Sequence, residues 1–403
     1  MIVFRIVRFK NMIRKVSIPL ILMAFMTGCA GSSVSDKTAD STYNSETRDD
    51  NVDDIGAEEN DASQDEVTII MAGDILLHDP VNAAAKREDG TYDYSAVFAN
   101  TAEYISAADI AIVNQEVIIG GEELGVSGYP NFNAPEDVQT ALCDAGFDVV
   151  LHATNHALDR GKQGILNCLD SWEENHPEIE VIGINESSEE QDEIPLVESN
   201  GITFAILNYT YGTNGIALPD DMPYAVNLMD EAHKEEIKED LIKADELADF
   251  VIVCPHWGTE YVLEQTTEQE QWASFFAENG ADLIIGTHPH VIEPIEMVGD
   301  TLCYYSLGNF VNWTSGEGEG VANRMVGALA EITVTRDEAG EAVIKEYSYE
   351  PVVTHVTEGT DGVTVYFLSD YNEELSLSNE IRKQDSNFDY DYCVNLCDRV
   401  FEE

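Results

Sequence analysis

Basic residues are scarce in this chain of 403 residues. Lys and Arg together number 20 against 78 Asp and Glu, which gives a formal net charge of −58. A chain this acidic cannot neutralise phosphates, so the composition excludes nucleic acid as a partner. It would concentrate cations instead. A polyanionic partner would need metal ions or a local basic groove, for which Arg160 and Arg324 are candidates because they lie near the motifs described below.

Cysteine is also sparse, with seven residues in the chain. Cys254 and Cys303 lie in apolar, strand-like runs, where a buried thiol acts as a small hydrophobic side chain. Cys393 and Cys397 are four residues apart and would share one face of a helix, which leaves a disulfide or a metal clip open. Their spacing is not that of a zinc ribbon, so no such module is predicted.

The N-terminal apolar run is too short to span a membrane. Val16–Met26 holds fewer than the roughly 20 residues that a bilayer requires, and it follows a basic stretch. Gly28-Cys29-Ala30 comes next. The arrangement resembles a bacterial lipoprotein signal, which implies cleavage before Cys29 and lipid on its thiol. An uncleaved anchor is the alternative. Either one tethers the protein to the extracytoplasmic face of the cell membrane.

Large apolar side chains are almost absent from residues 30–66. Such a segment cannot offset its ordering entropy, so a disordered acidic linker is predicted. The rest of the chain is long enough to bury a sizeable core. The predicted organisation is a signal peptide over 1–28, the linker over 29–66, one α/β domain over 67–350 and a C-terminal extension over 351–403.

Strand-like runs alternate with amphipathic stretches after residue 66. Buried strands are predicted at 67–72, 110–113, 148–151, 250–254 and 282–285. Helical spacing predicts helices at 96–107, 135–145, 161–174, 230–248, 267–279 and near 376–403. This order favours βαβ units with parallel strands. Period-two alternation over 328–335 and 342–349 predicts an antiparallel hairpin.

Five of these strands end in residues that commonly bind metals. The carboxyl ends of parallel strands are where an open α/β sheet presents its site. The residues are Asp74, Glu116, Asn155, His156, His256, His288 and His290. Taken singly, a Gly-Asp is usually a turn and an Asn-His a helix cap. Their occurrence together at five strand ends instead predicts a hydrolytic centre that binds divalent metal ions. Two ions are expected, and each would be Mn, Fe or Zn.

Each of these residues has a predicted role. Asp74 and His290 would bind the first ion, and Glu116 would bridge both ions. Asn155, His256 and His288 would complete the second ion. His156 would stay free as a general acid or an oxyanion stabiliser, and Asp159 would fix its tautomer.

The same residues carry a family resemblance across Val67–Phe310. The motifs are Gly73-Asp74, Asn114-x-Glu116, Asn155-His156-x-x-Asp159-x-Gly161, His256-Trp257-Gly258-x-Glu260-Tyr261, Gly286-x-His288-Pro289-His290 and Ser306-Leu307-Gly308-Asn309-Phe310. They resemble the CapA/PgsA family of bacterial poly-γ-glutamate capsule proteins, related in fold to calcineurin-like metallophosphoesterases. The resemblance implies a four-layer α/β/β/α metallophosphoesterase-like sandwich, an extracytoplasmic location and an anionic cell-envelope polymer as partner.

The Asp-x-His of the wider superfamily is missing, because Leu76 stands in the place of the histidine. His78 is a candidate substitute; without one, the first ion is under-liganded. Two functions therefore stay open. One is a lipid-anchored, metal-dependent hydrolase that acts on poly-γ-glutamate or a related polymer during capsule synthesis. The other is a non-catalytic accessory subunit that scaffolds a membrane polymer synthase or exporter.

Overall fold

The structure is a computed structural model that describes residues 66–313, 316 and 320–401. All of them belong to one unit of the chain, Ala62–Glu403. The predicted signal peptide, the predicted lipid attachment at Cys29 and the predicted linker up to residue 65 lie outside the described residues. Within the described part, every helix is too short or too polar to cross a membrane.

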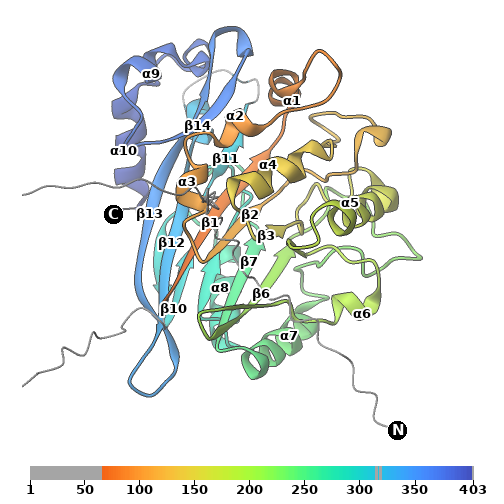
Figure 1. Cartoon of the computed structure of the whole chain (residues 1–403). Coiled ribbons are helices and arrows are strands. Elements are labelled where there is room, and N and C mark those ends of the chain that lie inside the picture. Colours follow the sequence, from red (N-terminus) through yellow and green to blue (C-terminus); the bar gives the residue numbers. More distant parts are fainter. Residues whose placement is uncertain (1–65, 314–315, 317–319, 402–403) are drawn as a thin grey trace, which may run out of the picture. The chain divides into compact units, whose positions relative to one another are not determined.

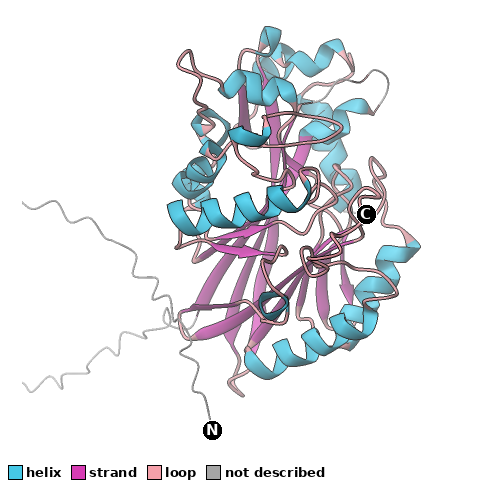
Figure 2. Ribbon diagram, turned by 90° about the vertical axis from the view of Figure 1, so that its right-hand side faces the viewer, coloured by secondary structure: helices cyan, strands magenta, loops and turns pink. Residues whose placement is uncertain are grey.

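Two β-sheets form the centre of this unit (Figures 1 and 2). The strands of the first sheet are β1 (Glu66–Leu76), β2 (Ile110–Asn114), β3 (Val149–Leu151), β4 (Glu180–Ile182), β11 (Asn309–Asn312), β12 (Val326–Arg336), β13 (Ala342–Val356) and β14 (Val363–Phe367). Those of the second sheet are β5 (Leu196–Ser199), β6 (Ile202–Thr210), β7 (Phe250–His256), β8 (Leu283–Ile285), β9 (Ile295–Val298) and β10 (Thr301–Tyr304).

The strand order brings the predicted strand ends together. The first sheet runs β14-β13-β12-β1-β2-β3-β4, with β11 also paired to β1, and the second runs β5-β6-β7-β8-β10-β9. Strands β1 to β4 are parallel, and so are β6, β7, β8 and β10. The predicted βαβ pairing is therefore confirmed. The predicted hairpin is also confirmed as β12 and β13, which are antiparallel.

The helices connect and cover these strands. They are α1 (Asp79–Ala85), α2 (Ser95–Phe98), α3 (Ala102–Ile105), α4 (Asp137–Ala145), α5 (Gly161–Asn175), α6 (Ser188–Gln191), α7 (Lys234–Leu247), α8 (Thr267–Glu278), α9 (Glu373–Ser378) and α10 (Tyr390–Phe401). Short 3₁₀ turns are η1 (Glu122–Leu124), η2 (Val321–Met325), η3 (Glu358–Thr360) and η4 (Glu380–Lys383).

In place of the single helix predicted near 376–403, the structure has the end of α9, then η4 and α10. Two further predicted helices differ from the structure for local reasons. The single helix predicted at 96–107 is wrong, because α2 and α3 are separate there. Between them the side-chain amide of Asn100 donates to the carbonyl oxygen of Val365 in β14, at 3.1 Å. The helix predicted from residue 230 begins at Lys234. Asp230 accepts the backbone N–H of Ala232 and of His233 with its side chain, and such a turn competes with the helix.

The chain is layered as a sandwich. Successive side chains of β6 and β7 point to opposite faces. Ile206 and Ile252 belong to the core shared with the first sheet, whereas Leu207 and Val253 pack with side chains of α7 and α8. Helices α2 to α5 lie along the first sheet on its other side (Figure 1). The predicted four-layer α/β/β/α order is confirmed.

The C-terminal residues continue the first sheet. Strand β13 runs from Ala342 to Val356, so the predicted division between 350 and 351 falls inside it, and β14 pairs with its last residues. In α10 the thiols of Cys393 and Cys397 are buried and free, as are those of the other cysteines in the described part of the chain except the half-buried, free Cys143. Cys393 and Cys397 therefore serve as core side chains and form no disulfide.

Glu293 is a fully buried carboxyl outside the predicted metal set. It accepts a hydrogen bond from the side-chain amide of Gln269 at 2.6 Å. Burial raises the pKa of Glu293 from 4.5 to about 8. Between pH 4.5 and about 8, the Glu293 carboxyl is ionised in the unfolded chain but still protonated in the folded protein. The free energy of unfolding should therefore fall as pH rises, by up to about 1.4 kcal/mol per pH unit.

Glu293→Gln should remove this decline and be more stable than the wild type at about pH 8. Urea unfolding of both proteins with a chelator present, from about pH 5 to about pH 8, measures the difference. Equal pH slopes for the two proteins would show that Glu293 titrates like an exposed glutamate.

Candidate metal centre

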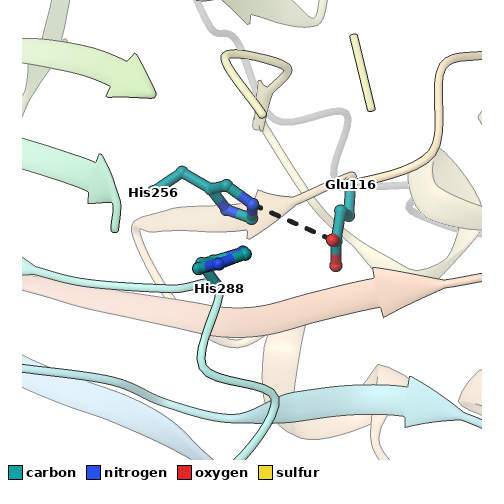
Figure 3. A group of neighbouring side chains, drawn as sticks. All are labelled: Glu116, His256 and His288. Carbon is teal, nitrogen blue, oxygen red and sulfur yellow. Dashed lines mark ion pairs between the residues drawn. The ribbon is translucent and has the colours of Figure 1, made fainter. Parts of the chain in front are cut away.

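Glu116 lies at the meeting point of two groups of ligand-type side chains. It groups with His256 and His288, and separately with Asp74 and His290; in each group the ligand atoms all lie within 4.8 Å of one another. Figure 3 shows the first group, with the His256 imidazole directed at the Glu116 carboxylate. A carboxylate shared by two groups has the position predicted for a ligand that bridges two ions.

Both sheets contribute to each group. Asp74 lies in β1, just after Gly73, and Glu116 follows β2 of the same sheet. His256 is the last residue of β7, and His288 and His290 follow β8 of the second sheet. The first sheet thus supplies the carboxylates and the second sheet supplies the imidazoles.

Close backbone approach fixes the position of Asp74. A Cβ at Gly73 would lie 2.1 Å from the carbonyl oxygen of Gly308, so only glycine allows β1 to pass this loop. The backbone N–H of Asp74 donates to the same oxygen at 3.0 Å. On the facing side, the backbone N–H of His288 donates to Asp74 Oδ2 at 3.2 Å. His288 has a φ of 101°, in the left-handed region, which turns its N–H toward the first sheet.

Polar residues that had no predicted role hold these ligands in place. Asn114 Nδ2 donates to Asp74 Oδ1 at 2.8 Å. Thr287 Oγ1 lies 3.0 Å from His256 Nδ1, and Asn309 Oδ1 lies 3.0 Å from His290 Nδ1. Partners of this kind orient metal-binding rings. Asn114 and Asn309 stand inside the motifs quoted above, and their place in those motifs was the only signal in the sequence.

Asn155, His156 and Asp159 lie beside the group formed by Glu116, His256 and His288. Asn155 Oδ1 is 2.9 Å from His256 Nε2, next to the Glu116 carboxylate. His156 belongs to neither group, and its Nδ1 lies 2.7 Å from Asp159 Oδ2. Its ring packs edge-on against Phe132, with centroids 4.6 Å apart. The structure therefore places all eight predicted residues together; their roles as ligands and acid stay predictions.

The position that lacks a superfamily histidine is filled by an apolar residue. Leu76 is buried in the hydrophobic core. His78 lies at the N-cap of α1 and belongs to neither ligand group, although it is near the centre. Burial, together with the nearby charges of His290 and Arg324, lowers the pKa of His78 to about 3. Asp74, Glu116 and His290 are therefore the described side chains grouped around the first predicted position.

Buried polar atoms without partners make the centre suitable for a cation. Neither oxygen of Glu116 accepts a hydrogen bond from any described residue, and His288 Nδ1 also has no partner there. Burial raises the pKa of Glu116 well above its usual range and lowers that of His256 and His288 well below theirs. Burial opposes charge on His290 too, but Glu116 and Asp74 outweigh it and raise its pKa to about 9.

Unpaired carboxylate oxygens inside a protein are costly. Carboxylates beside neutral imidazoles are the donor set of Zn²⁺ and similar divalent ions. The residues present therefore fit a divalent cation at each of the two groups.

Comparison with known proteins identifies the family of the chain. The family model described as bacterial capsule synthesis protein PGA_cap matches residues 68–314, which is more than half of the chain and includes every grouped side chain. The chain belongs to this capsule synthesis family. The family resemblance expected from the sequence is confirmed.

The chain is similar to two biosynthesis proteins named CapA from Bacillus species. The chain is 36% identical over 178 residues to the PGA biosynthesis protein CapA of Bacillus subtilis, which covers 43% of this chain and 45% of the relative. It is 28% identical over 258 residues to the capsule biosynthesis protein CapA of Bacillus anthracis, covering 62% and 61%. This member of the capsule synthesis family thus spans about half to three-fifths of the length of these two relatives.

A solved structure resembles this family member distantly. A putative 5′-nucleotidase from Staphylococcus aureus aligns with 70% of this chain and 54% of its own, at 15% identity and a TM-score of 0.41.

Proposed function

We propose that this protein is a metal-dependent hydrolase of the cell envelope that acts on poly-γ-glutamate or a related capsule polymer. One observation carries the proposal: the fully buried Glu116, without a hydrogen-bond partner among the described residues, is shared by two ligand groups. The imidazoles of His256 and His290 approach its two oxygens only to 3.8 and 3.7 Å, which is longer than a hydrogen bond. Neither oxygen of Glu116 is therefore satisfied by a described protein donor.

Divalent ions supply Lewis acidity and an activated water to a hydrolytic site. The residues that would hold them are Asp74, Glu116, Asn155, His256, His288 and His290. His156 is available for proton transfer, because Asp159 holds its Nδ1 and leaves Nε2 as the atom that passes a proton to the leaving group. Whether the scissile bond is a phosphoester or an amide decides which leaving atom receives that proton.

The test combines metal analysis of the purified domain with a substrate panel. We expect bound Mn, Fe or Zn, and hydrolysis of a phosphodiester or of a γ-linked glutamate oligomer that stops with chelator and returns with metal. A protein that binds metal but hydrolyses neither substrate with any of the three metals would contradict the enzymatic proposal.

A second candidate function is supported by Leu76. That residue leaves the first position with three grouped side chains, and an under-liganded ion there would stabilise the fold rather than support turnover. In this alternative the protein is an accessory subunit that scaffolds a membrane polymer synthase or exporter. The His156 substitution discussed below separates the two functions.

The proposed location rests on Cys29 in the lipoprotein-like signal. Acyl chains contribute about 0.8 kcal/mol per buried CH₂, so two or more of them anchor a protein to a membrane. Cys29→Ser should release the protein from the membrane fraction or stall its processing, whereas Cys143→Ser should leave it membrane-bound. Fractionation and labelling with a fatty-acid analogue measure this. A wild-type chain that takes up no label would exclude lipidation.

A further inference from the structure

Arg324 has no acidic partner among the described residues of this strongly acidic chain. Several other basic side chains of the described part pair with carboxylates, for example Arg87 with Asp93 and Arg336 with Asp249. Arg324 is half-buried, and its Nε donates to the carbonyl oxygen of Val321 at 2.9 Å. Because no described acid neutralises this partly desolvated cation, an anionic ligand is a suitable partner for it.

This arginine is tied to the metal centre through Asn309. The side-chain amide of Asn309 donates to the carbonyl oxygens of both Arg324 and His290, each at 3.0 Å. The same side chain lies 3.0 Å from His290 Nδ1 through its oxygen. One residue therefore fixes the backbone of Arg324 and the ring of a predicted ligand together.

The guanidinium group lies over an aromatic ring beside the same ligand. It is 5.3 Å from the centre of the Tyr261 ring, and that ring is 5.9 Å from the His290 ring. Tyr261 is 52% exposed, so solvent and a ligand can reach this side of the centre. The neighbouring acid Glu260 is exposed and forms no ion pair with Arg324. Tyr261 therefore contacts the guanidinium both through its ring and through a side-chain hydrogen bond, which orients the group beside the centre.

Arg160, the other arginine singled out from the sequence, is arranged differently. Its guanidinium donates to the carbonyl oxygens of Gly125 and Asp159, each at 3.4 Å, and to the hydroxyl of Ser127. Protein acceptors thus occupy both of its terminal nitrogens, whereas its buried Nε has no partner among the described residues. Arg160 supports the loop that carries His156. Of the two arginines proposed from the sequence for a basic groove, Arg324 is therefore the remaining candidate.

We propose that Arg324 and Tyr261 form a carboxylate-binding subsite beside the metal centre. A guanidinium group offers two parallel N–H donors, which match the two oxygens of a carboxylate. The anion is a pendant carboxylate of the polymer chain, and this identity rests on the proposed function. Arg324 positions the polymer so that its backbone crosses the face of His290 and Glu116. Because the rest of the protein is so negatively charged, the position of the Arg324 guanidinium determines which segment of a polyanion binds.

Binding of a γ-linked glutamate pentamer tests the subsite without requiring turnover. Isothermal titration compares metal-loaded wild type with Arg324→Gln, Arg324→Lys and the control Arg336→Gln, which removes the same charge from a remote surface ion pair. A second pentamer with amidated pendant carboxyls serves as the matched ligand. Loss of a charged hydrogen-bonded pair corresponds to about a 10- to 100-fold weaker affinity. We expect this loss for Arg324→Gln, a partial loss for Arg324→Lys and none for Arg336→Gln.

The amidated pentamer should bind wild type and Arg324→Gln alike. Equal affinity of wild type and folded, metal-loaded Arg324→Gln for the carboxylate pentamer would overturn the subsite, as would no binding by wild type. If inorganic phosphate binds more tightly than the pentamer and depends on Arg324, the carboxylate assignment is overturned. Binding that depends on Arg324 in a protein without any hydrolysis would support the subsite while the hydrolase proposal fails.

Discussion

Glu116→Gln should remove both ions from the protein at once. The substitution keeps the shape of the side chain but takes away the carboxylate that the two ligand groups share. An ion that binds only the folded state, at a thousandfold excess over its Kd, stabilises by about 4 kcal/mol. We expect that stabilisation to disappear in the variant, together with the bound metal and all metal-dependent turnover.

The effect of Glu116→Gln on stability should change sign when a chelator removes the metal. Without metal, the wild type buries an unpaired carboxylate, which Glu116→Gln replaces with a neutral amide. The variant should therefore be at least as stable as the wild type without metal and less stable with it. Metal analysis and melting curves with and without chelator measure both halves. Glu293→Gln is the matched control, since Glu293 is equally buried and belongs to neither group. If Glu116→Gln retained a full complement of metal, Glu116 would not be a ligand.

His156→Ala should keep metal and fold but lower turnover by about 10²- to 10⁴-fold, the usual contribution of a positioned general acid. His156 lies outside both ligand groups, so its loss removes no group member. Asp159→Asn should have a smaller effect in the same direction, because Asp159 holds the His156 ring and accepts the backbone N–H of Phe132. His233→Ala, in an exposed Asp-His pair, is the control.

The same variant distinguishes an enzyme from a scaffold in cells. If the protein is a hydrolase required for capsule synthesis, cells with His156→Ala should lose polymer while the protein remains at normal abundance. An accessory subunit would instead support normal polymer production with His156→Ala. Intact polymer, combined with no measurable hydrolysis by the wild type, would decide in favour of the scaffold.

The strands that carry ligands could be predicted because they are short, buried and continuous apolar runs. In β2 and β7 the predicted residues lie within the observed strands, and each strand ends at the polar residue that the sequence indicated. Strand β6 was not predicted, since its last residue, Thr210, is not a typical metal ligand. It nevertheless lies inside the second sheet, between β5 and β7. The break between α2 and α3 depends on the distant contact from Asn100 to β14, which helical periodicity cannot reveal.

The chemistry of the centre was predictable only for its rarer residue types. A histidine or acid at the end of a buried strand is unusual enough to stand out. Asn114 and Thr287 are common residue types, and their importance comes from contacts with Asp74 and His256 that sequence separation conceals. Arg324 was singled out for its charge, but its difference from Arg160 depends on which protein oxygens lie near each guanidinium.

The division of ligands between the sheets has a kinetic consequence. The first sheet holds the carboxylates and the second the imidazoles, so neither sheet alone presents a complete group. Metal uptake can then occur only after the sheets have docked, late in folding. An interaction absent from the folding transition state slows unfolding and leaves the folding rate nearly unchanged. Bound metal would thus slow the unfolding of the finished domain, and a chain that stops half-folded would remain metal-free and open to proteolysis.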